Sequence, residues 1–245
     1  MQRLIILSMF ISGIAGAQIP TQPTPKLMQM TSYNASGDTT IGKISPDGDY
    51  MEIINVKGLI TSRGELKNGS RNGVWREYNL AGMLQRADEY RNGVKNGASL
   101  KFYNAGQVSQ DATYKNDSLE GRRLTYMTNG KIKSSETYSN GQYNGEVKTF
   151  YDDGKPQEQA NYKFGKRHGI NQWFQQNGNI SAEYNYENGS LEGFSKEFDE
   201  KGNVKREGNY KTNNEDGEWK EYFETILVKK INYKNGKIVK EVNVK

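Results

Sequence analysis

The chain has 245 residues, and exchanging tyrosine for glycine in its 33% hydrophobic fraction gives roughly 38%, below the about 45–50% typical of globular domains. Aromatic residues nevertheless make up 11%, too many for a disordered chain, so the composition favours a thin, glycine-rich β protein. No cysteine is present and only one histidine, His168, which excludes disulfides, thiolate metal sites and cysteine nucleophiles. The net charge of +5 comes from basic residues interleaved with acidic ones, so no nucleic acid partner is expected.

Residues 1–17 have the features of a cleavable signal peptide. Arg3 supplies a positive charge, an apolar stretch follows over residues 4–14, and small residues at 15–17 form a cleavage site before Gln18. The apolar stretch is too short for a transmembrane anchor, although a buried N-terminal strand is an alternative. We therefore expect an exported protein, periplasmic or extracellular. Residues 18–48 contain three prolines in their first part and are expected to form a linker and N-terminal segment.

From residue 73 onward the sequence repeats with a period of 24 residues. Each repeat begins at a glycine, in the series Gly73, Gly97, Gly121, Gly145, Gly169, Gly193 and Gly217. A fixed period of this length indicates a repeat architecture. Seven repeats span residues 73–240, a degenerate repeat precedes them at 49–72, and a C-terminal tail follows at 241–245.

Further rows of residues recur when positions are counted from that glycine as zero. Position 5 is always aromatic, and in the first six repeats position 9 is glycine and position 11 is apolar. Position 17 is tyrosine in those repeats, and the last repeat, one residue shorter, has its tyrosine one place early: Tyr90, Tyr114, Tyr138, Tyr162, Tyr186, Tyr210 and Tyr233.

These rows predict how the strands of a repeat pair. A three-residue hairpin loop at positions 7–9, with glycine last, sets the aromatic residue at position 5 across from the aliphatic residue at position 11. A second turn at Asn92-Gly93 and its equivalents is expected near position 20, and the odd positions 5, 11 and 17 are expected to share one face. The predicted fold is all-β, an elongated single-layer antiparallel meander of stacked 24-residue β-hairpin repeats.

Two motifs recur at the repeat boundaries. The first is Asn-Gly-x-Trp-x-x-Tyr at residues 72–78, with a close variant at 216–222, and the second is Tyr-x-Asn-Gly at 90–93 and 138–141. They resemble the MORN-repeat variant family (MORN_2 type), whose members are often labelled YwqK-family antitoxin-like proteins. The resemblance covers residues 73–240 well and 49–72 weakly. It implies a string of β-hairpins used as a binding scaffold, with the antitoxin label a family name rather than a mechanism.

No pattern in the chain indicates catalysis. His168 occupies position 23, which is Asn, Glu or Asp in the other repeats, so a hydrogen-bonding role is favoured, with Tyr162 and Tyr186 expected across from it. The acidic pairs at 152–153 and 215–216 fall in predicted turns and lack the spacing of a calcium loop. Phosphate loops, nucleophile elbows and metal-ligand clusters are missing from the sequence. We expect no catalytic residue, no metal and no cofactor, and predict that the chain is not an enzyme.

Aromatic residues at even positions are the candidate binding residues. They occur among polar residues, and they are Trp75, Trp173, Trp219, Tyr103, Tyr151 and Phe223. We expect the tryptophans on the face opposite the aromatic rows, where large aromatic side chains are typical of binding hot spots. The alternative is that a curling sheet or the N-terminal segment buries them.

Two functions of different classes fit the sequence. The first is a non-enzymatic exported repeat scaffold that binds a protein or another component of the cell envelope. The alternative is a cell-wall or carbohydrate-binding module that uses exposed aromatic side chains. The sequence identifies neither the partner nor the oligomeric state.

Overall fold

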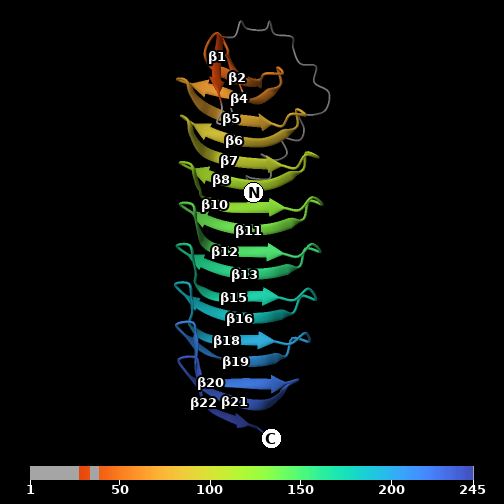
Figure 1. The fold of residues 1–245 in the computed structure, drawn as a ribbon, viewed down its shortest axis with the longest axis vertical. Coiled ribbons are helices and arrows are strands. Elements are labelled where there is room, and N and C mark those ends of the chain that lie inside the picture. Colours follow the sequence, from red (N-terminus) through yellow and green to blue (C-terminus); the bar gives the residue numbers. More distant parts are fainter. Residues whose placement is uncertain (1–27, 34–38, 245) are drawn as a thin grey trace, which may run out of the picture.

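The computed structural model describes residues 28–33 and 39–244, so the expected signal peptide lies outside the described residues. These residues form 22 strands in a single sheet, in which every pairing is antiparallel and joins strands that follow one another in the chain or are separated by one short strand. Figure 1 shows the result, an elongated column of stacked hairpins. The predicted all-β meander of hairpin repeats is confirmed.

The sheet starts before the first clear repeat. Strands β1 (Met28–Tyr33) and β2 (Thr39–Ile44) lie in the segment expected as linker, and β3 (Tyr50–Asn55) and β4 (Ile60–Lys67) lie in the degenerate repeat. The next strands are β5 (Ser70–Tyr78), β6 (Leu84–Arg91), β7 (Val94–Phe102), β8 (Val108–Lys115), β9 (Ser118–Leu119), β10 (Gly121–Tyr126), β11 (Ile132–Ser139), β12 (Gln142–Phe150) and β13 (Pro156–Lys163). The array ends with β14 (Lys166–Arg167), β15 (Gly169–Phe174), β16 (Ile180–Glu187), β17 (Ser190–Leu191), β18 (Gly193–Phe198), β19 (Val204–Lys211), β20 (Asn214–Phe223), β21 (Ile226–Lys234) and β22 (Lys237–Asn243).

The hairpin loop has the predicted form in the first six repeats. In the first repeat Tyr78 pairs with Leu84, and the same pairing of position 5 with position 11 recurs in the next five repeats. Asn79 N–H donates to Met83 O at 3.0 Å, which leaves positions 7–9 as a three-residue loop. Gly82 ends that loop with a φ of 77°, a left-handed conformation that glycine adopts without strain.

The expectation that positions 5, 11 and 17 share one face was wrong for position 17. Beside the hairpin loop the pairing slips by one residue, so that Glu77 pairs with Arg86 and Gly73 with Tyr90. The extra residue in the second strand is a β-bulge, and it reverses which side chains of that strand face which way. The tyrosines of position 17 therefore lie on the same face as the tryptophans. Trp219, for example, contacts both Tyr210 and Tyr233.

Hydrogen bonds between stacked turns join each repeat to the one before it. The second turn consists of two left-handed residues, such as Asn92 and Gly93 with φ of 50° and 84°, as in type I′ hairpins. The N–H of its second residue donates at 2.8–3.0 Å to the carbonyl of position 22 one repeat earlier. These donor and acceptor residues are Gly93 and Arg71, Asp117 and Lys95, Gly141 and Leu119, Gly165 and Tyr143, Gly189 and Arg167, Asn213 and Leu191, and Gly236 and Glu215.

Three strands are interrupted at position 23. The gaps fall at Glu120, His168 and Glu192, which separate β9 from β10, β14 from β15 and β17 from β18. The expected pairing of His168 was wrong, because Tyr162 pairs with Arg167 and Tyr186 pairs with Gly169. The turn before His168 contains two residues, so its centre lies between them and not on Gly165, and this shifts the partner of Tyr162 by one. The His168 N–H donates to Asn161 O, and its Nδ1 is buried without a hydrogen-bond partner.

The buried side chains form a narrow row along the sheet. Most come from positions 2 and 15 of successive repeats, and these are Trp75, Asp88, Ser99, Ala112, Glu136, Val147, Ala160, Asn171, Ser195, Trp219 and Ile231. Many of them are small or polar, in agreement with the low hydrophobic content. The core is thus a narrow line along the array, widened in places by buried neighbours such as Ser134, Tyr138 and Tyr233.

Candidate functional site

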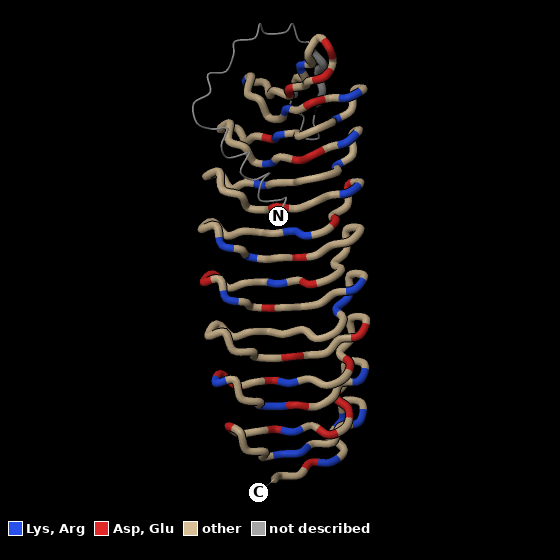
Figure 2. Tube along the Cα trace, turned by 180° about the vertical axis from the view of Figure 1, so that it is seen from behind, with Lys and Arg blue, Asp and Glu red and all other residues tan. Residues whose placement is uncertain are grey.

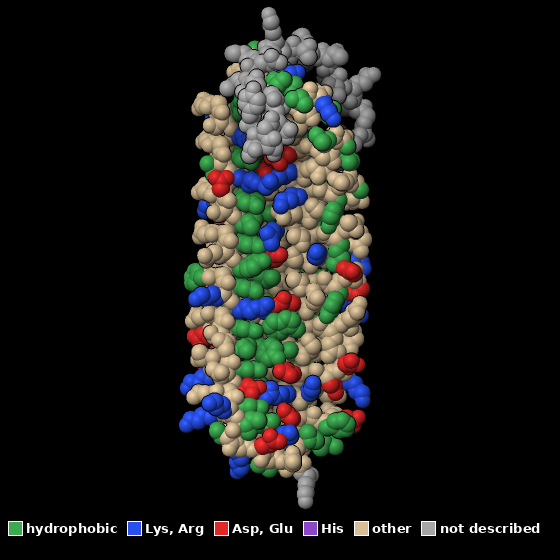
Figure 3. Space-filling view, in the orientation of Figure 1, with side chains coloured by type: hydrophobic (Ala, Val, Ile, Leu, Met, Phe, Trp, Pro, Cys, Tyr) green, Lys and Arg blue, Asp and Glu red, His purple; other side chains and the backbone are tan. Residues whose placement is uncertain are grey.

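A continuous column of side chains runs along the face that carries the tyrosines of position 17. Across each tight turn that tyrosine pairs with position 22 of the same repeat, as in Tyr90 with Lys95 and Tyr162 with Arg167. We call this set the tyrosine column: Tyr90, Lys95, Tyr114, Leu119, Tyr138, Tyr143, Tyr162, Arg167, Tyr186, Leu191, Tyr210, Glu215 and Tyr233. Figure 3 shows hydrophobic side chains following one another along this face, with cations between them.

Rings and cations stack on one another within the column. The ring centroids of Tyr138 and Tyr143 lie 4.8 Å apart, and those of Tyr143 and Tyr162 lie 5.0 Å apart. Lys95 Nζ lies 4.7 Å from the ring centroid of Tyr114, within the range of cation–π attraction. These contacts fix the side chains in place, so the column presents a preorganised surface.

The charges near the column are paired. Asp88, only 2% exposed, accepts from Ser99 Oγ at 2.6 Å and binds Lys95 Nζ at 2.8 Å. Glu136 pairs with Arg123 and accepts from Tyr138 Oη at 2.7 Å. Basic and acidic residues also alternate along the strands when the molecule is seen from behind (Figure 2). The surface therefore lacks a strong field of one sign, and aromatic area is its main binding property.

Two tyrosines of this face are held firmly in the neutral form. Burial raises the pKa of Tyr138, and its hydrogen bonds with Tyr143 and Glu136 raise it further. Burial and a hydrogen bond to Glu197 likewise raise the pKa of Tyr184. Both phenols remain hydrogen-bond donors at neutral pH.

Trp75 and Trp219 are buried at opposite ends of the array. They are 2% and 0% exposed, and each indole Nε1 donates to a backbone carbonyl at a bulge of the preceding strand, Glu65 O at 2.7 Å and Asn209 O at 3.0 Å. An arginine covers each ring, with Arg206 4.1 Å from the ring centroid of Trp219. Side chains covered in this way cannot touch a partner directly. For Trp75 and Trp219 the structure therefore favours the alternative in which the tryptophans are buried.

Trp173 differs from the other two tryptophans because it is only half-buried. Its ring lies 5.6 Å from Tyr184 and 6.5 Å from Tyr186, and the Arg167 guanidinium lies 5.0 Å from its centroid. It therefore lies beside the tyrosine column at β13–β16 and adds aromatic area to it. Of the three tryptophans it is the one that the structure leaves accessible.

The other candidate residues lie at the hairpin loops. Tyr103 Oη donates to Tyr126 O at 2.6 Å and Tyr151 Oη donates to Phe174 O at 2.7 Å, so each phenol ties its loop to the next repeat. Phe223 is 70% exposed. These three residues lie at the loop ends of their strands. The structure does not bring the six candidates together as one site.

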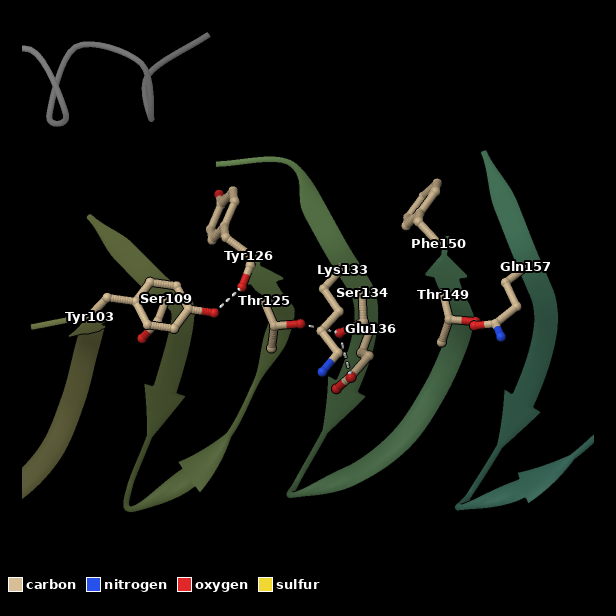
Figure 4. A pocket seen from close by; sticks show the side chains of 10 residues that line it. All are labelled: Tyr103, Ser109, Thr125, Tyr126, Lys133, Ser134, Glu136, Thr149, Phe150 and Gln157. Carbon is tan, nitrogen blue, oxygen red and sulfur yellow. Dashed lines mark hydrogen bonds between the residues drawn. The ribbon is translucent and has the colours of Figure 1, made fainter. Parts of the chain in front are cut away.

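A hollow of about 460 Å³ opens over β10, β11 and β12 (Figure 4). Thr125, Ser134 and Thr149 form its floor, and Tyr103 and Lys133 are among the other residues that line it. Sequence reasoning missed this hollow and the position 22 members of the column. A comparison of position 4 across the repeats would have revealed the two threonines where other repeats have large side chains, whereas position 22 varies too much in residue type to form a recognisable row.

In the part of the chain that the structure describes, no group of three or more His, Cys, Asp or Glu side chains could hold a metal ion. The same part contains no helix with the length and apolar character needed to cross a membrane.

The repeats match a known family model. Its description is MORN repeat variant, and it matches residues 95–116, 119–140, 143–164, 167–188, 191–212 and 215–235. The six matches follow one another at the 24-residue period and together cover more than half of the chain. None of the curated proteins compared with this chain matches it.

Proposed function

The chain belongs to the MORN repeat variant family, and from this premise we propose that it is an exported, non-enzymatic scaffold that binds a protein of the cell envelope along its tyrosine column. The repeat scaffold is the established part of this statement. Export, the class of partner and the absence of catalysis are proposals.

One observation carries the proposal, the continuity of the tyrosine column. Most of its aromatic members are partly exposed, although Tyr138 and Tyr233 are buried, and their neighbours hold them in place. Tyrosine and tryptophan contribute large contact areas with little loss of side-chain entropy, which makes them common hot spots of interfaces. Because the column is straight and repeats with the strands, an elongated partner segment could contact several repeats at once.

Trp173 is the residue that tests the proposal. We expect Trp173→Ala to weaken capture of an envelope protein by about 2 kcal/mol or more if Trp173 is a hot spot. The matched control is Ile170→Ala on the same strand, because Ile170 is 53% exposed and lies on the opposite face. The protein captured from envelope extract would be identified, purified and titrated against both variants. Equal binding by the two variants would remove the column from consideration.

The carbohydrate-binding alternative is tested in parallel by sedimentation with peptidoglycan. Sedimentation of the purified chain that Trp173→Ala abolishes, without a captured protein, would favour that alternative. An antitoxin activity would be one form of protein binding, and the identity of the captured protein would test it.

Export has its own test. If residues 1–17 are a signal peptide, mass spectrometry of the protein from its native cells should find an N-terminus near Gln18. A cell-associated protein that retains Met1 would contradict the exported part of the proposal.

A further inference from the structure

The hollow over β10, β11 and β12 exists because three small side chains stand side by side there. Thr125 pairs with Ser134, and Ser134 pairs with Thr149 across the next strand. At position 4, where these threonines lie, other repeats have Glu77, Lys101, Trp173, Glu197 and Glu221. The larger side chains fill the corresponding space, so the hollow is a local departure from the repeat.

The floor of the hollow is a row of hydroxyl groups. The Oγ1 of Thr125 and the Oγ of Ser134 lie 2.7 Å apart, and Ser134 Oγ donates to Glu136 Oε1 at 2.9 Å. Thr149 Oγ1 is 3.4 Å from Gln157 Oε1 at the far side. Hydroxyl and amide groups from four adjacent strands suit a ligand that itself has several neighbouring hydroxyls.

An aromatic ring borders the same space on the face of the hydroxyl groups. Tyr103 is at position 6, an even position like that of Thr125, and its Oη donates to Tyr126 O at 2.6 Å (Figure 4). This hydrogen bond holds the ring beside the hydroxyl row, where a six-membered sugar ring can stack its C–H face on it. Tyr103 is half-exposed, so a ligand can reach it.

One positively charged side chain at the hollow has no ion-pair partner among the described residues. Glu136 is neutralised by Arg123, whereas Lys133 at the rim is exposed and forms no ion pair among the described residues. A ligand that places a carboxylate at Lys133 would supply that partner.

We propose that this hollow binds a saccharide that carries a carboxylate, of the uronic acid class. The hydroxyl floor exchanges hydrogen bonds with the sugar hydroxyls, Tyr103 stacks against the sugar ring, and Lys133 pairs with its carboxylate. A volume of about 460 Å³ is within the usual range of small-ligand sites. The site is separate from Trp173, so it does not depend on the protein partner proposed above.

The test is calorimetric titration of the full chain with a disaccharide that contains glucuronic acid. We expect saturable binding that Lys133→Gln weakens about tenfold or more, since a charged hydrogen bond is lost. The matched control is Lys205→Gln, because Lys205 occupies position 12 of its repeat as Lys133 does, outside the hollow. That variant should bind like the wild type.

Two further experiments distinguish the effect of the hollow's shape from the effect of its charge. Thr125→Lys introduces the residue that position 4 has in the preceding repeat, Lys101, and should abolish binding by filling the hollow even though it adds a positive charge. The uncharged glucose disaccharide should bind about tenfold more weakly than the acidic one. Absence of saturable binding, equal affinity of Lys133→Gln and Lys205→Gln, or unchanged binding by Thr125→Lys would each overturn the proposal. Trp173→Ala should leave this titration unaltered, so the failure of one proposal is distinguishable from that of the other.

Discussion

Gly208 has no side chain, and Trp219 occupies the space that one would need. A Cβ built at Gly208 would lie 2.2 Å from Trp219 Cδ2, and one at Gly64 would lie 2.6 Å from Trp75 Cγ. We predict that Gly208→Ala destabilises the protein by about 1–3 kcal/mol through overpacking, measured by urea unfolding. Combination with Trp219→Phe should recover part of that loss, because the smaller ring relieves the overlap.

The matched control for this prediction is the same position in other repeats. Position 15 is alanine at Ala112 and Ala160, so the strand itself accepts a Cβ there. Ala160→Gly should therefore cost no more than about 1 kcal/mol, by loss of packing and backbone entropy. Unfolding curves of Gly208→Ala that coincide with the wild type would show that Trp219 is not packed as described.

The hydrogen-bonded tyrosines predict a loss of stability in alkali. Burial first, and hydrogen bonding second, raise the pKa of Tyr138 and Tyr184 above the unfolded value of about 10. Their contribution to stability is complete below that unfolded pKa and is lost as the pH rises through the higher folded pKa. Unfolding measured over this range should become easier in the wild type, and Tyr138→Phe should reduce the slope. An identical slope in the variant would contradict the assigned burial.

At the scale of the strand, the side chain at position 23 determines whether the tight turn of the next repeat has a hydrogen-bond acceptor. Glu120 Oε2 accepts from Asn140 N–H and Glu192 Oε2 accepts from Thr212 N–H, each at 2.8 Å. His168 forms no such bond to the equivalent turn residue Asn188 among the described residues, and its Nδ1 is unpaired. We predict that His168→Glu stabilises the protein by about 0.5–1.5 kcal/mol, seen as a higher melting temperature. The reverse change, Glu192→His, should destabilise it similarly, and a loss of stability in His168→Glu would refute the explanation.

The interrupted strands also predict which seams of the sheet open first. Between β13 and β15 only Glu158 with Trp173 and Gln159 with Gln172 pair, and the seams β8–β10 and β16–β18 are equally short. Pro156 removes a backbone donor on β13, but the other two seams are as short without a proline there. Amide hydrogen exchange should be faster at these three seams than between β11 and β12, where three consecutive pairs rather than two form before the register shifts. Equal protection would mean that the gaps do not weaken the array.

For the molecule as a whole, the repeat period was enough to predict the hairpins, the three-residue loop and the pairing of position 5 with position 11. The bulge beside that loop was not predictable in the same way, because a single unpaired residue leaves the 24-residue period unchanged while it reverses the face of Tyr90 and its equivalents. The candidate site was predicted less well. The recurring tyrosines were found as a row but were not among the candidate binding residues, whereas Thr125, Ser134 and Thr149 matter only because of their neighbours in space.

The stacked array predicts that a whole repeat can be removed with less damage than a single residue. Deleting residues 97–120 joins position 23 of one repeat to position 0 of another, so the remaining hairpins meet the same kinds of neighbours as before. Deleting Lys148 from the middle of β12 instead moves the following side chains to the wrong face and misaligns the pairs with β11 and β13. Circular dichroism melts should show a cooperative transition for the shorter array and a lower or broadened one for the single deletion. Deletion of Ala81 from a hairpin loop is the control and should be milder, because the last repeat already pairs Phe223 with Ile226 around a two-residue loop. A repeat deletion that melts below the Lys148 deletion would show that contacts beyond nearest neighbours hold the array together.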